Sequence, residues 1–199
     1  MRKSFSHNAA RLISTLFVPP SFTIIIFTFL AFYLETETTK IIVTLSVAYS
    51  LGFAAPIILY FILRNKKLLI DSDASIKEER TLPFSIAIIF YLIGLLIFIY
   101  FEVSIISTAF WFCYISNTII TILINKYWKI SAHSMGAAGP FAALIFVLGF
   151  PAIYFLIIVL IIGWARIKLK CHSFLQVAAG AVLAFVSTYL QIYFIVHYF

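Results

Sequence analysis

Seven apolar runs, separated by short polar breaks, decide how this chain can fold. They cover residues 12–34, 41–63, 84–101, 103–124, 134–150, 152–164 and 173–196. A helix of about 20 apolar residues crosses the ~30 Å hydrocarbon layer of a membrane. Inside that layer each segment must satisfy its own backbone polar groups, which favours helices over open strands. We therefore predict an all-α, polytopic transmembrane bundle of six or seven spans.

The composition leaves no room for a soluble domain. Hydrophobic residues make up 64% of the chain and charged residues 11%, whereas soluble domains carry about 25% charged residues. The longest polar stretch, 64–83, is too short to bury a core of its own. We expect one integral-membrane domain over residues 1–199. Cys113 and Cys171 lie in or beside apolar runs, and we interpret them as unpaired thiols.

Three details of the runs predict local structure. Pro19 and Pro20 should kink the first run or mark its true start. The fifth and sixth runs have about 15 residues, or about 22 Å of helix. Either their polar breaks dip below the membrane surface, or the helices extend beyond these runs. Aromatic residues such as Trp111, Trp128 and Trp164 are interpreted as anchors at the membrane interface.

The basic residues predict an orientation. With seven spans, thirteen of the fourteen Lys and Arg residues lie on the side of the N-terminus and the breaks at 64–83, 126–133 and 165–172, and only Lys40 lies on the other. The positive-inside rule makes the first side cytoplasmic. The net charge of +7 then reflects topology and attraction to anionic lipid. No soluble basic surface supports a nucleic-acid partner.

The break at 165–180 reads A-R-I-K-L-K-C-H-S-F-L-Q-V-A-A-G and places basic residues where an apolar helix begins. A helix N-terminus presents unbonded N–H groups and a partial positive charge. Together with Arg166, Lys168 and Lys170, it suits an anion such as phosphate. His172 and Gln176 are about one helical turn apart and share a face.

Two stretches resemble the signatures of the type 2 phosphatidic acid phosphatase superfamily. The third signature of that family is S-R, five residues, H, three residues, D. Here Arg166, His172 and Gln176 keep its spacing, with Ala165 for Ser and Gln176 for Asp. The family's second signature, P-S-G-H, is similar to I-S-A-H at 130–133. The resemblance covers about residues 126–185 and is that of a divergent bacterial-type member.

The resemblance implies a fold, a reaction and a location. The bundle core would be like that of the family, in a bacterial inner membrane. The chain would hydrolyse a phospholipid or isoprenoid phosphate or diphosphate, without metal or cofactor. His172 would form a phosphohistidine, His133 would be the general acid, and Gln176 would orient His172. The groups implied or considered for binding the substrate phosphate carry a positive charge or a hydroxyl: Arg166, Ser131, Lys77, Arg80 and Lys129.

Two departures from the family pattern keep alternatives open. The first signature, K-x6-R-P, has only K-E-E-R-T-L-P at 77–83 as its nearest match. An apolar hairpin at 84–125 then separates it from the second signature. Lys77 and Arg80 therefore either reach the phosphate or belong to an ordinary charged loop. Gln176 cannot supply the charge of an Asp. The alternative function is a catalytically degenerate, phosphatase-like membrane protein that binds anionic lipid or acts as a transporter or scaffold.

A second alternative comes from the acidic residues of the same loop. Membrane prenyltransferases hold Mg²⁺ on a diphosphate through D-x-x-x-D motifs in two loops. This chain has a D-x-D spacing in one loop and no second acidic loop. A Mg²⁺ site on the acidic residues Asp71, Asp73, Glu78 and Glu79 is therefore the lesser alternative. Because the phosphatase family that the chain resembles is metal-independent, we predict no metal.

Overall fold

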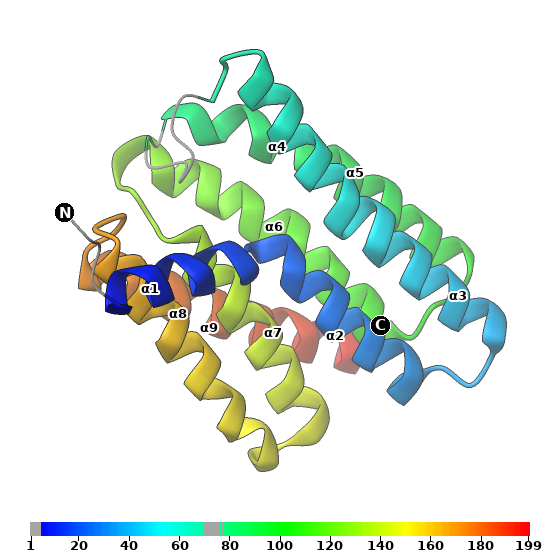
Figure 1. Cartoon of the computed structure of the whole chain (residues 1–199). Helices are drawn as coiled ribbons and strands as arrows, with labels where there is room; N and C mark the ends of the chain where they lie inside the picture. The colour runs from blue at the N-terminus through cyan, green and yellow to red at the C-terminus, as the bar shows by residue number, and fades with distance from the viewer. Residues whose placement is uncertain (1–4, 70–75, 77) are drawn as a thin grey trace.

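The computed structural model describes residues 5–69, 76 and 78–199, which form helices and connecting turns without a β-strand. The helices pack side by side into one bundle (Figure 1). Within these residues, five helices are long and apolar enough to cross a membrane, or six when α1 and α2 are taken as one bent span. The predicted all-α membrane bundle is confirmed.

The first apolar run forms two helices, α1 (Phe5–Leu16) and α2 (Pro19–Leu34), which meet at 58°. Pro19 and Pro20 occupy the first turn of α2. Proline has no N–H to donate, and its ring fixes φ near the helical value, so it begins a helix well and does not continue one. The pair therefore marks the start of α2, as the sequence predicted.

The second run bends its hydrogen-bond ladder around Pro56. It consists of α3 (Thr38–Val47), the π-helical segment η1 (Ala48–Ala54) and α4 (Ala55–Asn65). The Ala55 N–H donates to the Ser50 carbonyl, five residues back. A proline removes an i→i−4 bond and its ring presses on the carbonyl four residues earlier. The wider π turn relieves that clash in an otherwise continuous helix.

Trp111 forms the centre of an aromatic core and is not an interface anchor. It lies in α6 (Ile105–Tyr127), is fully buried, and donates its indole N–H to the Tyr91 carbonyl at 2.7 Å. Its neighbour α5 (Thr81–Tyr100) presents Gly94 to the ring, and a Cβ there would lie 2.5 Å from it. The interface interpretation of Trp111 was wrong because a glycine on an adjacent helix makes room for the ring inside the bundle.

Helix α7 (Ala132–Leu148) is the interior helix, and ten of its seventeen residues are buried. It packs most extensively against α9 (Phe174–Tyr198). Their approach is closest where Gly180 faces the start of α7, because a Cβ on Gly180 would lie 2.9 Å from the Ser131 carbonyl oxygen. The chain between them forms η3 (Phe150–Phe155), with Pro151 in its first turn, and α8 (Leu156–Lys168).

Candidate functional site

His172 lies in the tight turn that joins α8 to α9. Helix α8 ends with the Lys170 N–H donating to the Ile167 carbonyl at 2.9 Å and the Cys171 N–H donating to the Arg166 carbonyl at 3.1 Å. This is the Schellman pattern of bonds, with Lys170 in the left-handed conformation at φ 56°. Ser173 then caps α9. The turn thus fixes the backbone of His172 from both sides.

The capping box of α9 also fixes the tautomer of His172. The Ser173 N–H donates to Gln176 Oε1 at 3.1 Å, so the amide oxygen of Gln176 faces this turn. The same oxygen lies 3.2 Å from His172 Nδ1. An amide oxygen only accepts, so Nδ1 carries the proton and donates it. The lone pair of the imidazole is therefore on Nε2, on the opposite edge of the ring.

The guanidinium of Arg80 lies next to that lone pair. Arg80 is the last residue of the short 3₁₀ segment η2 (Glu78–Arg80), directly before α5, and its side chain is only 4% exposed. Nη2 lies 3.4 Å from His172 Nε2, while Nη1 donates to the Ile130 carbonyl at 2.9 Å. The structure thus brings Arg80 to His172, which the sequence left open. Lys77, the other candidate of this loop, lies outside the described residues.

The remaining candidates surround the same turn. Lys129 Nζ donates to the Cys171 carbonyl at 2.6 Å, beside His172. Ser131 is fully buried and is the N-cap of α7, where its Oγ accepts from the N–H and the hydroxyl of Ser134. Both contacts use Ser131 as an acceptor and do not consume its own hydroxyl proton. The Ser131 N–H donates to the Gln176 carbonyl at 3.3 Å, which ties the start of α7 to α9.

Arg166 and His133 meet at a residue that the sequence did not single out. Arg166 is 1% exposed, and its Nη1 donates to Ser14 Oγ at 2.6 Å. His133 Nε2 lies 3.2 Å from the Ser14 carbonyl oxygen, which makes Nε2 the protonated nitrogen. The sequence signal for Ser14 was weak. Ala10 and Ser14 are small and four residues apart, which places them on one face of a helix, and they are the two residues of α1 that the bundle buries. Such spacing marks the packed face but names no partner.

Burial and nearby cations keep His172 neutral. Burial, together with the smaller effects of the charges of Arg80, Lys129 and Arg166, lowers the pKa of His172 to about 3. The hydrogen bond to Gln176 acts in the opposite sense and is weaker. At neutral pH the imidazole is therefore uncharged, with its Nε2 lone pair intact. That is the protonation state in which histidine acts as a nucleophile.

We expect His172 to take up a proton only in strong acid. The pKa of about 3 in the folded protein lies below the usual 6.5 of a free histidine. Between these values only the unfolded chain binds the proton, so stability falls as the pH falls from about 6.5 towards 3. For any reaction that uses the His172 lone pair, the acid limb of the pH profile should lie below pH 5. Lys129→Met should move this limb to higher pH, because it removes one of the three cations.

Lys168 provides the matched control for the pH profile. It is exposed, carries the same charge as Lys129 and ends α8 close to the turn. Lys168→Met should leave the acid limb in place. If Lys129→Met and Lys168→Met move the limb equally, the effect comes from net charge and not from the cluster around His172.

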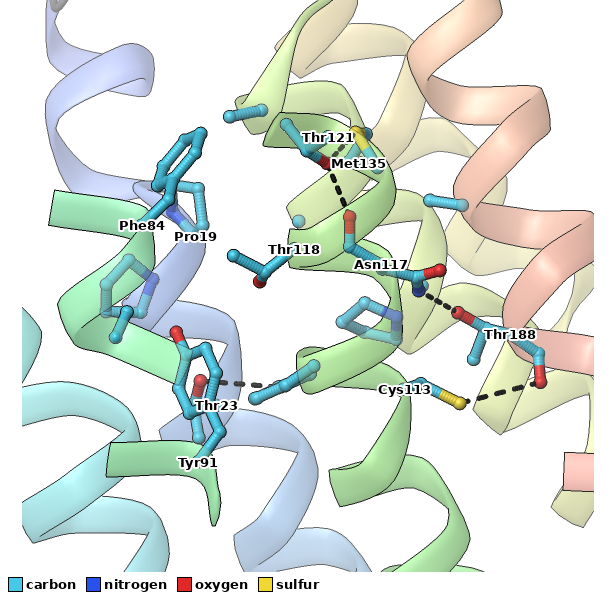
Figure 2. Close-up of a pocket in the computed structure, with 18 of the residues that line it drawn as sticks. Pro19, Thr23, Phe84, Tyr91, Cys113, Asn117, Thr118, Thr121, Met135 and Thr188 are labelled. Atoms are coloured by element: carbon cyan, nitrogen blue, oxygen red, sulfur yellow. Dashed lines mark hydrogen bonds between the residues drawn. The ribbon is translucent and has the colours of Figure 1, made fainter. Parts of the chain in front are cut away.

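A cavity of about 140 Å³ lies between the helices. None of the described side chains named above for this site lines it, but its wall includes Phe84 and Ala132, which lie within about one helical turn of Arg80 and His133 along the chain. Figure 2 shows side chains from α2, α5, α6, α7 and α9 around it, with the hydroxyls of several threonines among mostly apolar groups. The cavity therefore lies in the interior of the bundle, between apolar helices.

The described residues contain no group of three or more His, Cys, Asp or Glu side chains that could hold a metal ion. Asp71 and Asp73, on which a Mg²⁺ site would depend, lie outside the described residues. Cys113 and Cys171 are both free thiols. Cys113 points to the Thr188 carbonyl inside the bundle (Figure 2).

Comparison with protein-family models, curated proteins and solved structures finds no match to this chain. Residues from α1, the α5 entrance, the α6–α7 turn and the α8–α9 turn contact one another here. In Figure 1 these segments lie at the same end of the bundle as the N-terminus.

Proposed function

We propose that the protein is an integral-membrane lipid phosphatase that works through a phosphohistidine on His172. The observation that carries this proposal is the pair of contacts on the His172 ring, Gln176 at Nδ1 and Arg80 at Nε2. Gln176 holds the proton on Nδ1, so the lone pair on Nε2 faces a guanidinium that can bind phosphate. A nucleophile, an orienting group and a phosphate-binding cation are the parts that such a reaction needs.

The first step transfers the phosphoryl group to the enzyme. His172 Nε2 attacks the phosphorus while the bond to the ester oxygen breaks. Arg80, Arg166, Lys129 and the hydroxyl of Ser131 bind the phosphate oxygens, and their charges stabilise the transition state. The bound phosphate anion favours the imidazolium form of His133. His133 then gives its Nε2 proton to the departing alkoxide, which leaves as an alcohol.

The second step returns the enzyme to its starting state. Water attacks the phosphorus, and the now neutral His133 takes one proton from that water. The P–N bond breaks, and its electron pair returns to His172 Nε2. Inorganic phosphate is released, and both histidines are again as they began once His133 loses its proton. Gln176 Oε1 accepts the hydrogen bond from His172 Nδ1–H in both steps, so the tautomer of His172 is kept.

The surroundings of the site favour a lipid substrate. The cluster lies at one end of a bundle whose outer surface carries many exposed large apolar side chains. The cavity inside the bundle, with Phe84, Met135 and Ala132 in its wall, is mostly apolar and reaches Ala132, the residue before His133. A phosphate ester with a hydrocarbon chain can place its headgroup at His172 and the start of its chain in this cavity.

Location and topology form part of the proposal. We place the protein in a bacterial inner membrane, with the N-terminus and the site on the cytoplasmic side. The excess of Lys and Arg on the polar breaks at this end supports that orientation.

Phosphate release by the purified protein tests the proposed function. We expect wild-type protein in detergent to release inorganic phosphate from phospholipid or isoprenoid phosphates in the presence of a chelator. The panel should compare monophosphates with diphosphates on glycerol-based and isoprenoid chains. If no member of the panel is hydrolysed but anionic lipid still binds, the degenerate, binding-only alternative replaces the phosphatase.

A further inference from the structure

Helix α1 is attached to the rest of the bundle by few buried contacts. Only Ala10 and Ser14 of its twelve residues are buried, and it packs mainly against α8. Phe5, Leu12 and Leu16 are largely exposed on its other side. Ile13 is the partly buried apolar residue through which α1 packs against the core. Two buried small side chains and one partly buried isoleucine are little apolar contact to lose when the helix moves away. Within the described chain, α1 is therefore well suited to move relative to the bundle.

Ser14 bonds to two side chains that the proposed reaction needs. Its hydroxyl oxygen accepts from Arg166 at 2.6 Å, and its carbonyl oxygen contacts His133 at 3.2 Å. Ser14 is one of the last four residues of α1, whose carbonyls have no partner within a regular helix. A phosphate oxygen bonded to the same Arg166 nitrogen would need the position of the Ser14 hydroxyl. Ser14 thus mimics two oxygens of a phosphate group.

The α1–α2 junction has the properties of a hinge. Val18 is extended, with φ −69° and ψ 152°, and α1 and α2 meet at 58°. Pro19 and Pro20 have no N–H, so the helical ladder of α2 does not continue into α1. Pro19 rests on Gly136 of α7, where an added Cβ would lie 2.8 Å from its Cβ. This contact holds the start of α2 while α1 changes its angle.

We infer that α1 is a lid over the phosphate site and that Ser14 is its closing residue, which the substrate phosphate displaces. This inference rests on the proposed function, because it uses the same phosphate position. With the lid closed, Ser14 bonds to Arg166 Nη1 and to His133 Nε2. With phosphate bound, the anion takes over both contacts and α1 swings outward about Val18. Ser14 therefore sets the affinity for the phosphate group by competing with it.

Cysteine modification of the full-length protein tests the movement. In Ser14→Cys the thiol replaces a buried hydroxyl, and its rate of modification by a maleimide can be followed by peptide mass spectrometry. We expect saturating inorganic phosphate to raise this rate about tenfold or more. Thr15→Cys, at an exposed neighbouring position, should react quickly with or without phosphate. The native, buried Cys113 provides an internal reference for loss of structure.

Calorimetric titration with inorganic phosphate tests the competition and does not depend on turnover. Ser14→Ala should bind phosphate about tenfold more tightly than wild type, because a hydrogen bond to a charged group no longer has to be broken. Thr15→Ala should bind as wild type does. Tighter binding by Ser14→Ala together with faster labelling at position 14 supports the lid.

The other outcomes overturn the inference in distinguishable ways. If phosphate binds but labelling at position 14 does not change, α1 is not a lid and the proposed function stands. If Ser14→Ala binds phosphate more weakly, Ser14 supports Arg166 and His133 and does not compete with the substrate. If neither wild type nor Ser14→Ala binds phosphate, the proposed function fails, and the lid fails with it.

Discussion

His172→Ala should abolish phosphate release from every lipid phosphate that the wild-type protein hydrolyses. The loss should be about 10⁴-fold or more, since removal of a nucleophile leaves only binding and electrostatic effects. The reason is specific to this turn. Gln176 contacts Nδ1 of His172 and Arg80 contacts Nε2. Among the hydrogen bonds of the described residues, no other histidine has an amide acceptor on one ring nitrogen and a guanidinium at the other. His172→Ala removes the reacting lone pair and leaves the cationic groups around it.

A trapping experiment reports on the same prediction independently of product release. Rapid mixing of wild-type protein with a labelled lipid phosphate, followed by quenching in base, should yield a labelled peptide that contains His172. His172→Ala should yield none. His197→Ala is the control, because His197 is exposed at the end of α9 and bonds to the Tyr193 carbonyl and stacks on the Tyr193 ring of its own helix. Wild-type rates in His172→Ala would remove His172 from the mechanism.

The sequence predicted the architecture well because a membrane leaves few choices. Apolar runs of about 20 residues form helices since no other structure satisfies their backbone in lipid. The prolines at 19 and 20 were interpreted correctly from their missing N–H groups. The π-helical turn before Pro56 was not predicted, because it depends on how the ladder rearranges around a clash. Trp111 was misplaced because its environment is set by Gly94, on another helix.

The candidate site could be predicted only in part. The spacing of Arg166, His172 and Gln176 places them around one helix start, and the structure shows the bond between His172 and Gln176. Arg80 lies 92 residues before His172, and its contact arises because the assembled bundle brings the side chain of this η2 residue to the α8–α9 turn. Ser14 is farther still from Arg166, by 152 residues. Local spacing carries no information about such pairs, which arise when helices assemble.

Gln176 gives the second large effect, through two substitutions with opposite consequences. In Gln176→Leu the side chain keeps its bulk but loses the oxygen that accepts from the Ser173 N–H and from His172 Nδ1–H. The tautomer of His172 is then no longer fixed, and the proton can move to Nε2, where it blocks attack. Loss of an orienting acceptor costs about 10²–10⁴ in kcat in a comparable catalytic histidine. We expect a fall within this range.

Gln176→Asp should preserve or raise the rate, because it supplies a charge as well as an acceptor. A carboxylate one turn from His172 stabilises the imidazolium that forms as Nε2 attacks. It also favours α9, since a negative charge in the first turn interacts well with the helix N-terminus. The same charge raises the pKa of His172 from its low value. The neutral imidazole is then lost at a higher pH than in wild type, so the acid limb of the pH profile moves upward.

Measurement of kcat and of the pH profile for wild type, Gln176→Asp and Gln176→Leu decides the role of this residue. Gln191→Leu is the matched control: Gln191 lies on the same helix and bonds to Ser187, away from the turn. It should keep the wild-type rate and acid limb. A Gln176→Leu rate equal to wild type would show that His172 needs no orienting partner. If Gln176→Asp gains rate and moves the acid limb upward, the wild-type amide fixes the tautomer of His172 and lacks only the charge.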